Sequence, residues 1–354
     1  MSFGDRINAC VAGSTGSRLL LDALPLVDTD AGRRLVEIIR RHHCAARQGM
    51  RDPDRRFRDF QNHVIHVHGG FWGGGPRVAH RWLCRAVDAA ARGRRRDAAH
   101  AIGVMMHYVF DALHPLHTEQ NARERVLHFP VEAITYLNYE RFLNRWRHDD
   151  GRAVSRLPGG PTWLGEHMMR GAANANADFW TMLCDFDIRR CVDEPSKCFG
   201  GRFERATAAW VGICVTSAAR IIERAGQVIA DRRDELELPA YSTPTFRSDA
   251  VAMFAAAPFG TLRRRRDRRR LLKRLQNHVR CFVRDGDVES VLPAEVRIVH
   301  RVVDVHHHEQ RWRRLRGRDN PFLRLYTGDA VDGYDQPESR HANSAAIKPS
   351  RRAA

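Results

Sequence analysis

The sequence is poor in features that would place the chain in a membrane or outside the cell. It contains no run of 18 apolar residues, so no membrane-spanning helix is expected. Its opening stretch, MSFGDRINACVAGSTGSR, lacks the charged segment and following apolar segment of a secretory signal. The eight cysteines are therefore expected to be reduced thiols, and we predict a cytoplasmic protein.

Strict alternation of apolar and polar residues, the pattern of a half-buried β-strand, is almost absent before residue 240. Apolar residues recur instead at helical spacing, which predicts an all-α fold. Pro130 is expected in the first turn of a helix that runs on through AITYLNYERFLNRW, because its missing N–H costs nothing there. The other expected helices cover residues 17–48 in two pieces, 55–68, 77–91, 95–114, 162–183 and 202–234.

Composition divides the 354 residues into four parts. Residues 1–235 are long enough to bury one large helical core. Residues 236–262 contain three prolines and are expected to be a linker. Residues 263–327 form a basic, mainly helical region, and residues 328–354 are poor in apolar residues and are expected to be a disordered tail.

The stretch HYVFDALHPLHTEQNARERVLHFPVE concentrates side chains that bind metals. His107 and Asp111 are four residues apart, as are His128 and Glu132, so each pair lies on one side of a helix. A proline ends the first helix, which leaves His117 just past that end and able to turn back toward the same point. Imidazole and carboxylate donors without cysteine are typical of open, catalytic zinc sites.

Residues upstream of this stretch supply further donors. Asp52 lies 11 residues before His63 and 14 before His66, and both histidines precede a glycine-rich loop. With His107 and Asp111, they would form one site of mixed carboxylate and imidazole character. The choice between the two histidines is nearly even, with the spacing in favour of His66.

A second, three-ligand site would consist of His117, His128 and Glu132, with one position left for water. If Asp111 bridged the two sites, it would hold two zinc ions close together, an arrangement suited to displacement at phosphorus. Three simpler interpretations stay open: a buried hydrogen-bonded network without metal, an ordinary helix start around His128, and an ordinary Asp-Pro turn at Asp52.

This pattern resembles the bacterial zinc-dependent phospholipase C family and its relatives, the fungal single-strand-specific nucleases. The resemblance covers roughly residues 20–235, and the donor types come in the family's order and nearly at its spacing. It rests on three motifs. The first is H-Y-x-x-D-x-x-x-P-x-H, at His107, Tyr108, Asp111, Pro115 and His117. The second is H-x-x-x-E, at His128 and Glu132, and the third is G-x-x-D with a histidine 14 residues after the aspartate, at Gly49, Asp52 and His66.

The resemblance implies an all-α fold that binds three zinc ions and hydrolyses phosphate esters or phosphodiesters, such as phospholipid head groups. It also implies that Asp52 is both a ligand and a general base, and that Asp111 bridges two metals. In the family a mature N-terminal tryptophan and a nearby histidine help to hold the third zinc ion. Here the first tryptophan is Trp72 and the first histidine is His42, so two zinc ions are expected.

The net charge of +17 is unevenly distributed. From Thr261 onward there are 23 Lys and Arg residues against 12 Asp and Glu residues. Such a surplus favours partners that carry phosphate, either an anionic membrane or nucleic acid. The sequence leaves three functional classes open: a phospholipase C-like enzyme, a single-strand nuclease-like enzyme, and a non-catalytic metal-binding or interaction protein on the same fold.

Overall fold

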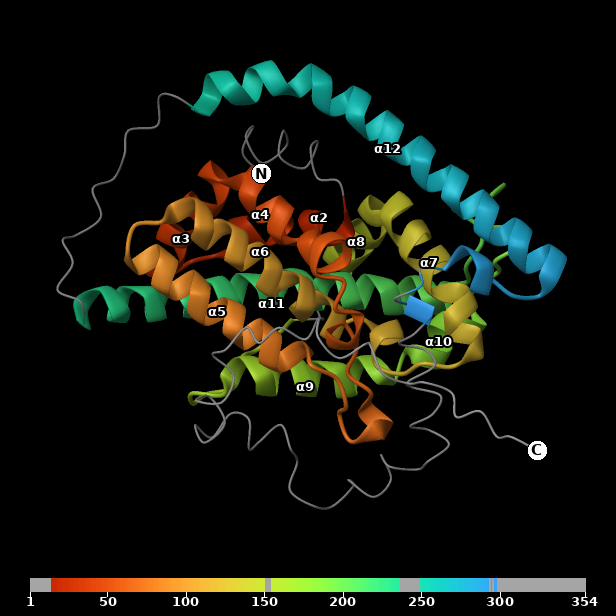
Figure 1. Ribbon diagram of the computed structural model, residues 1–354, viewed down its shortest axis with the longest axis horizontal. Helices are drawn as coiled ribbons and strands as arrows, with labels where there is room; N and C mark the ends of the chain where they lie inside the picture. The colour runs from red at the N-terminus through yellow and green to blue at the C-terminus, as the bar shows by residue number, and fades with distance from the viewer. Residues whose placement is uncertain (1–13, 150–153, 236–248, 293, 295, 298–354) are drawn as a thin grey trace, which may run out of the picture.

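The computed structural model describes residues 14–149, 154–235, 249–292, 294 and 296–297. This part of the chain is a bundle of helices without a β-strand (Figure 1). Only two isolated β-bridges occur in it, between His66 and Trp72 and between Phe186 and Phe199. The all-α class expected from the sequence is therefore confirmed for the described residues.

The order of elements follows the chain from α2 to α12. The α-helices are α2 (Thr15–Ala23), α3 (Asp30–Arg41), α4 (His43–Gly49), α5 (Gly75–Ala91), α6 (Arg95–Ala112), α7 (Ala122–Leu137), α8 (Tyr139–His148), α9 (Trp163–Asn176), α10 (Phe179–Cys184), α11 (Gly201–Glu235) and α12 (Asp249–Asp285). The short turns are η1 (Leu24–Leu26), η2 (Pro53–Phe57), η3 (Phe60–Asn62), η4 (Val67–Gly69), η5 (Pro115–His117) and η6 (Glu289–Val291).

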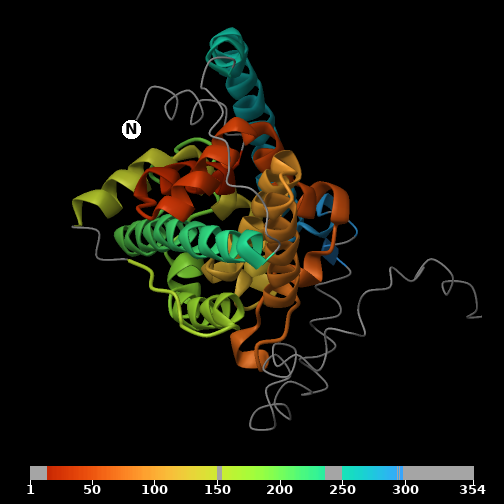
Figure 2. The same ribbon diagram turned by 90° about the vertical axis from the view of Figure 1, so that its left-hand side faces the viewer.

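Two helices form the centre of the bundle. Helix α6 packs against α5 and α4, and its fully buried apolar residues include Ala98, Ile102, Met105, Met106 and Val109. Helix α11 runs through the middle, with α2 and α3 on one side and α9 on the other (Figures 1 and 2). Helix α11 is long and apolar enough to cross a membrane, but 78% of its most apolar window is buried inside the fold. That burial is expected of the core helix of a globular domain.

Helices α4 and α6 approach each other backbone to backbone. A Cβ atom on Gly103 would lie 2.0 Å from the carbonyl oxygen of Ala46, and one on Gly49 would lie 2.0 Å from that of His100. Glycine is required at both positions because any side chain would push the helices apart. The close approach places Met50, the residue after α4, beside the metal-ligand candidates of α6.

The segment expected to be a helix over residues 55–68 instead contains the end of η2, the turn η3, a stretch of extended chain and the start of η4. Its backbone pairs with the turn η5: the N–H of Ile65 donates to the carbonyl of His117 at 2.8 Å, and that of Val67 donates to Thr118 at 3.0 Å. These long-range hydrogen bonds replace the helical ones. They bring the upstream histidines to the end of α6.

Pro130 lies in the interior of α7, whose first turn begins eight residues earlier and is capped by the side chain of Asn121. A proline inside a helix leaves the carbonyl four residues before it without its helical partner. That carbonyl belongs to Val126, and Nε2 of His278 on α12 donates to it at 2.7 Å. The helix that carries His128 is thus completed by a side chain from α12.

The C-terminal half of α12 docks on α7 (Figure 1). Leu275 is fully buried there, and the guanidinium of Arg274 lies 4.7 Å from the centre of the Phe129 ring. Helix α12 begins at Asp249, so residues 249–262 of the expected linker are helical. Residues 236–248, most of the basic region beyond 292 and the expected tail at 328–354 lie outside the described residues.

Candidate metal centre

A first group of donor atoms converges where the end of α6 meets the loop before α5. Nδ1 of His63 and Nε2 of His107 are 3.1 Å apart. Oδ2 of Asp111 lies 2.8 Å from the first nitrogen and 3.1 Å from the second. Oδ1 of Asp54 lies 3.7 and 3.5 Å from the same two nitrogens. Two imidazoles and two carboxylates therefore face one point.

A second group lies beside the first, between η5 and α7. Oε1 of Glu132 is 3.6 Å from Nε2 of His117 and 3.3 Å from Nε2 of His128. The two carboxylates at the edges of the groups, Asp54 and Glu132, have side chains that are 55% and 48% exposed. The histidines are mostly buried, so both groups are open to solvent on their carboxylate side.

Asp111 faces both groups with different oxygen atoms. Its Oδ2 atom contacts His63 and His107, and its Oδ1 atom lies 4.0 Å from Nε2 of His117. The Oδ2 atom is buried and has no well-directed hydrogen bond within the described part of the chain. A carboxylate in this position is placed to bridge two cations.

The spacing of the donor atoms fits zinc. Zinc bonds to nitrogen or oxygen are about 2.0–2.1 Å long, so tetrahedral ligand atoms lie about 3.3 Å from one another. The six distances quoted for the first and second groups between imidazole nitrogen and carboxylate oxygen run from 2.8 to 3.7 Å. A hydrogen-bonded network satisfies pairs of atoms, whereas here three or four atoms surround one point.

Three of the histidines are held so that Nε2 faces the centre. Nδ1 of His107 donates to the carbonyl of Met50 at 2.9 Å, and Nδ1 of His117 donates to the carbonyl of His63 at 2.7 Å. Nδ1 of His128 is hydrogen-bonded to the buried carboxylate of Glu124. Metal-binding histidines typically use their second nitrogen in this way, which fixes the tautomer and the ring orientation.

The fourth histidine has the opposite orientation. His63 presents Nδ1 to the centre and turns Nε2 toward Asp59, whose Oδ1 atom lies 3.7 Å away. Asp59 is itself held by the Tyr108 hydroxyl, at 2.9 and 3.0 Å from its two oxygens, and by the amide of Asn62 at 2.7 Å. Asp59 thus lies behind His63 as Glu124 lies behind His128, but at 3.7 Å it is too far away for a hydrogen bond.

Histidines and carboxylates of the centre lie close enough to shift one another's pKa. Burial alone would lower the pKa of His63, but the neighbouring carboxylates of Asp111 and Asp59 outweigh burial and raise the pKa to about 10. Burial raises the pKa of Asp111, but the charges of His107 and His117 hold it well below its usual value. Metal binding at this site must therefore displace histidine protons.

Asp52, the expected ligand and general base, does not lie in either group. Its Oδ2 atom is 2.8 Å from Nε2 of His100 and 3.9 Å from a guanidinium nitrogen of Arg56. Asp52 and Asp54 stand on either side of Pro53 in a helical turn, so their side chains point in different directions. The structure therefore places Asp54 where the sequence analysis expected Asp52.

His66 also lies outside both groups, although the spacing favoured it over His63. It is buried, its N–H donates to the carbonyl of Trp72 at 2.7 Å, and the two rings lie 5.4 Å apart. His114, which is next to the motif, accepts a hydrogen bond from the N–H of Leu116 at 3.1 Å. Burial lowers the pKa of His114 to about 3, so this ring is a neutral cap of η5.

Three acidic residues of the centre were not predicted from the sequence. Asp59 and Glu124 each stand four residues before a histidine ligand candidate, and this spacing was a usable signal. Asp54 carried no such signal, because only the turn after Pro53 decides which aspartate faces inward.

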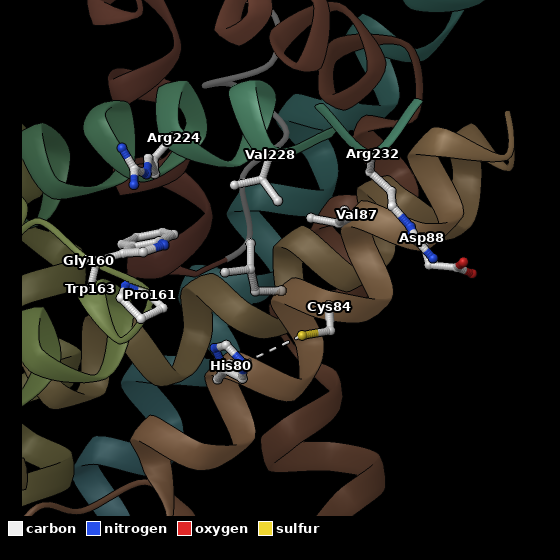
Figure 3. Close-up of a pocket in the computed structure, with 11 residues that line it drawn as sticks. His80, Cys84, Val87, Asp88, Gly160, Pro161, Trp163, Arg224, Val228 and Arg232 are labelled. Atoms are coloured by element: carbon white, nitrogen blue, oxygen red, sulfur yellow. Dashed lines mark hydrogen bonds between the residues drawn. The ribbon is translucent and has the colours of Figure 1, made fainter. Parts of the chain in front are cut away.

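A separate pocket of about 440 Å³ lies between α5, the start of α9 and α11. Figure 3 shows Trp163, Val87 and Val228 on its wall, with Arg224 and Arg232 at its rim. None of its lining residues belongs to the two donor groups.

No protein-family model and no curated protein sequence matches this chain. Among solved structures, it is similar to the alpha toxin from Clostridium absonum, with 14% sequence identity and a TM-score of 0.49 over 63% of this chain and 65% of that one. The alpha-toxin of an avian strain of Clostridium perfringens gives the same identity and TM-score, over 63% of this chain and 66% of the toxin. The matched region spans just under two thirds of each toxin. The likeness is distant.

Proposed function

We propose that the chain is a zinc-dependent hydrolase of phosphate esters or phosphodiesters. The observation that carries the proposal is the position of Asp111, whose two oxygens face two separate groups of histidine and carboxylate donors. Asp54, His63 and His107 would hold one ion, and His117, His128 and Glu132 the other. Two such ions supply a nucleophile near neutral pH and stabilise negative charge on a phosphoryl group.

The residues of the chain itself would order this centre. Met50, the His63 carbonyl and Glu124 hold three imidazole rings in the tautomer that leaves Nε2 without a proton. The exposed carboxylates Asp54 and Glu132 leave a path for substrate from solvent. The sequence resemblance favours a phospholipid head group as the substrate.

A nuclease-like phosphodiesterase is the second candidate. One observation favours it: the basic helix α12 packs directly on α7, the helix that carries His128 and Glu132. Both candidates share the same P–O bond chemistry. They differ in what the surface around the centre binds.

The substitution Asp111→Asn keeps the side-chain volume and removes the negative charge that faces both donor groups. We expect the zinc content of the purified protein to fall from two ions per chain to one or none. Hydrolysis of bis(p-nitrophenyl) phosphate should fall at least about 100-fold, with the far-UV circular dichroism unchanged. Two retained zinc ions and an unchanged rate would contradict the proposal.

The matched control is Asp22→Asn. Asp22 is a mostly buried aspartate that accepts a hydrogen bond from Tyr139 at 2.8 Å and lies in neither donor group. The Asp22→Asn protein should keep both zinc ions and hydrolyse the substrate at the wild-type rate. Phosphatidylcholine vesicles and a single-stranded oligonucleotide, offered to the zinc-loaded wild type, then separate the two candidate substrates.

A further inference from the structure

Helix α12 has an inner side that docks and an outer side that does not. Successive residues turn by about 100° around a helix, so residues at spacings of three, four, seven and eleven share a side. Leu271, Leu275, His278 and Phe282 follow this spacing, and all four are buried or partly buried against the domain. The direction opposite to them faces solvent.

That outer side carries a line of cations. Among the described side chains of α12, the exposed basic residues that point away from the docking side include Arg266, Arg269, Arg270, Lys273 and Arg280. We call these five residues the basic row. At 1.5 Å per residue, the row extends for about 21 Å along the helix.

The charges of the basic row are not used inside the fold. Across the part of the chain that the structure describes, no carboxylate forms an ion pair with any of the five. Arg284 lies on the same side but pairs with Asp285 at 2.6 Å, so it is left out of the row. Five like charges side by side repel one another, and an anionic ligand would relieve that repulsion.

The shape of the row decides between two kinds of phosphate-bearing partner. Helices that bind in a membrane interface place several large apolar side chains in the lipid beside their basic ones, whereas among the described side chains of α12 only Val283 is a large, exposed apolar residue. The exposed Val283, at 61%, lies about 80° around the helix from the middle of the row. Four guanidinium groups and one ammonium group along one side of a helix suit a chain of phosphates, because each guanidinium can bind one phosphate through two hydrogen bonds.

We propose that the basic row is a docking surface for the phosphate backbone of a single nucleic-acid strand. The row lies outside residues 20–235, in which the metal-ligand motif occurs. Binding there needs neither zinc nor hydrolysis, so it can be tested apart from the function proposed above. Because α12 packs on α7, a docked strand would lie on the helix next to the one that carries the second donor group.

The experiment measures binding of a fluorescent 20-nucleotide single strand of mixed sequence to the full chain by anisotropy, without added zinc. The row variant replaces all five residues with glutamine, which keeps helix propensity. The matched control replaces five exposed arginines elsewhere that form no ion pair within the described residues: Arg96, Arg156, Arg189, Arg202 and Arg205. Thermal unfolding checks that both variants are folded.

For the row variant, we expect binding at least about tenfold weaker at 50 mM salt, and a salt dependence reduced by about three in the slope of log K against log salt. The control variant should bind nearly as the wild type does, and so should Asp111→Asn. Equal losses in the row and control variants would show attraction by net charge alone and would overturn the proposal. So would a row variant that keeps its oligonucleotide affinity but loses binding to vesicles containing phosphatidylserine, which would identify a membrane surface instead.

Discussion

Of the two aspartates that flank Pro53, Asp54 faces the first donor group, whereas Asp52 contacts His100 and Arg56. The spacings within His107–Glu132 are local, and a helix converts them directly into shared faces. Both donor pairs therefore lie where the spacing placed them. The choice of aspartate depends on one turn around Pro53, and the choice of His63 over His66 depends on hydrogen bonds to a turn about fifty residues away. No local pattern encodes either.

The two aspartates allow a paired prediction. Asp54→Asn should remove about one zinc ion per chain, because it takes a charged donor from the first group. Asp52→Asn should leave the zinc content unchanged, because its carboxylate contacts His100 and Arg56. Elemental analysis of both proteins, purified without chelator, makes the comparison. The reverse result would restore Asp52 as the ligand.

At the scale of elements, helices with a strong apolar stripe were predictable and irregular segments were not. The expected helices over residues 77–91 and 95–114 correspond to α5 and α6 within two residues at each end. Residues 55–68 have the composition of a helix, but pairing with η5 overrides that preference. Helix α7 extends back past Pro130 because α12 supplies the missing hydrogen bond, and a partner so distant in sequence cannot be inferred from the segment itself.

The contact between α4 and α6 gives a prediction about stability. Gly103→Ala would place a Cβ atom 2.0 Å from a backbone oxygen, so the two helices must separate. We expect the free energy of unfolding to fall by about 1–3 kcal/mol. Zinc affinity should fall with it, because Met50 would move away from Nδ1 of His107.

Urea unfolding and a zinc-chelator competition measure these two effects of Gly103→Ala. Gly159→Ala is the control, because a Cβ atom there has no neighbour within 4 Å. Wild-type stability in the Gly103 variant would show that the helices do not need their close contact.

For the whole molecule, the ion pairs of the centre predict how the stability of the zinc-free protein depends on pH. The pKa of His63 rises from 6.5 to about 10 on folding, so its contribution is complete below pH 6.5 and is lost as the pH approaches 10. Asp111 and Glu132 have lowered pKa values, so their contribution is present above their usual values of 3.8 and 4.5 and is lost in acid. These three groups place the greatest stability between about pH 5 and 6.5, and the buried His114, whose pKa is lowered to about 3, moves the maximum toward the upper end of that range.

Thermal unfolding of chelator-treated protein from pH 3 to pH 10 measures this profile. In zinc-loaded protein the decline on the alkaline side should disappear, because the metal takes the place of the histidine protons. An alkaline decline of equal size with and without zinc would mean that His63 does not bind the metal.

The hydrogen bond from His278 to the Val126 carbonyl has a thermodynamic consequence for the protein as a whole. It joins α12, which carries the basic row, to α7, which carries His128 and Glu132. A ligand that changes how tightly α12 packs on α7 would therefore act on the basic row and on the second donor group together. Coupling free energies are reciprocal: if a ligand on one helix tightens that docking and raises zinc affinity, zinc must raise the affinity for the ligand by the same factor. A double cycle of titrations, each ligand in the absence and presence of the other, would measure that factor from both directions.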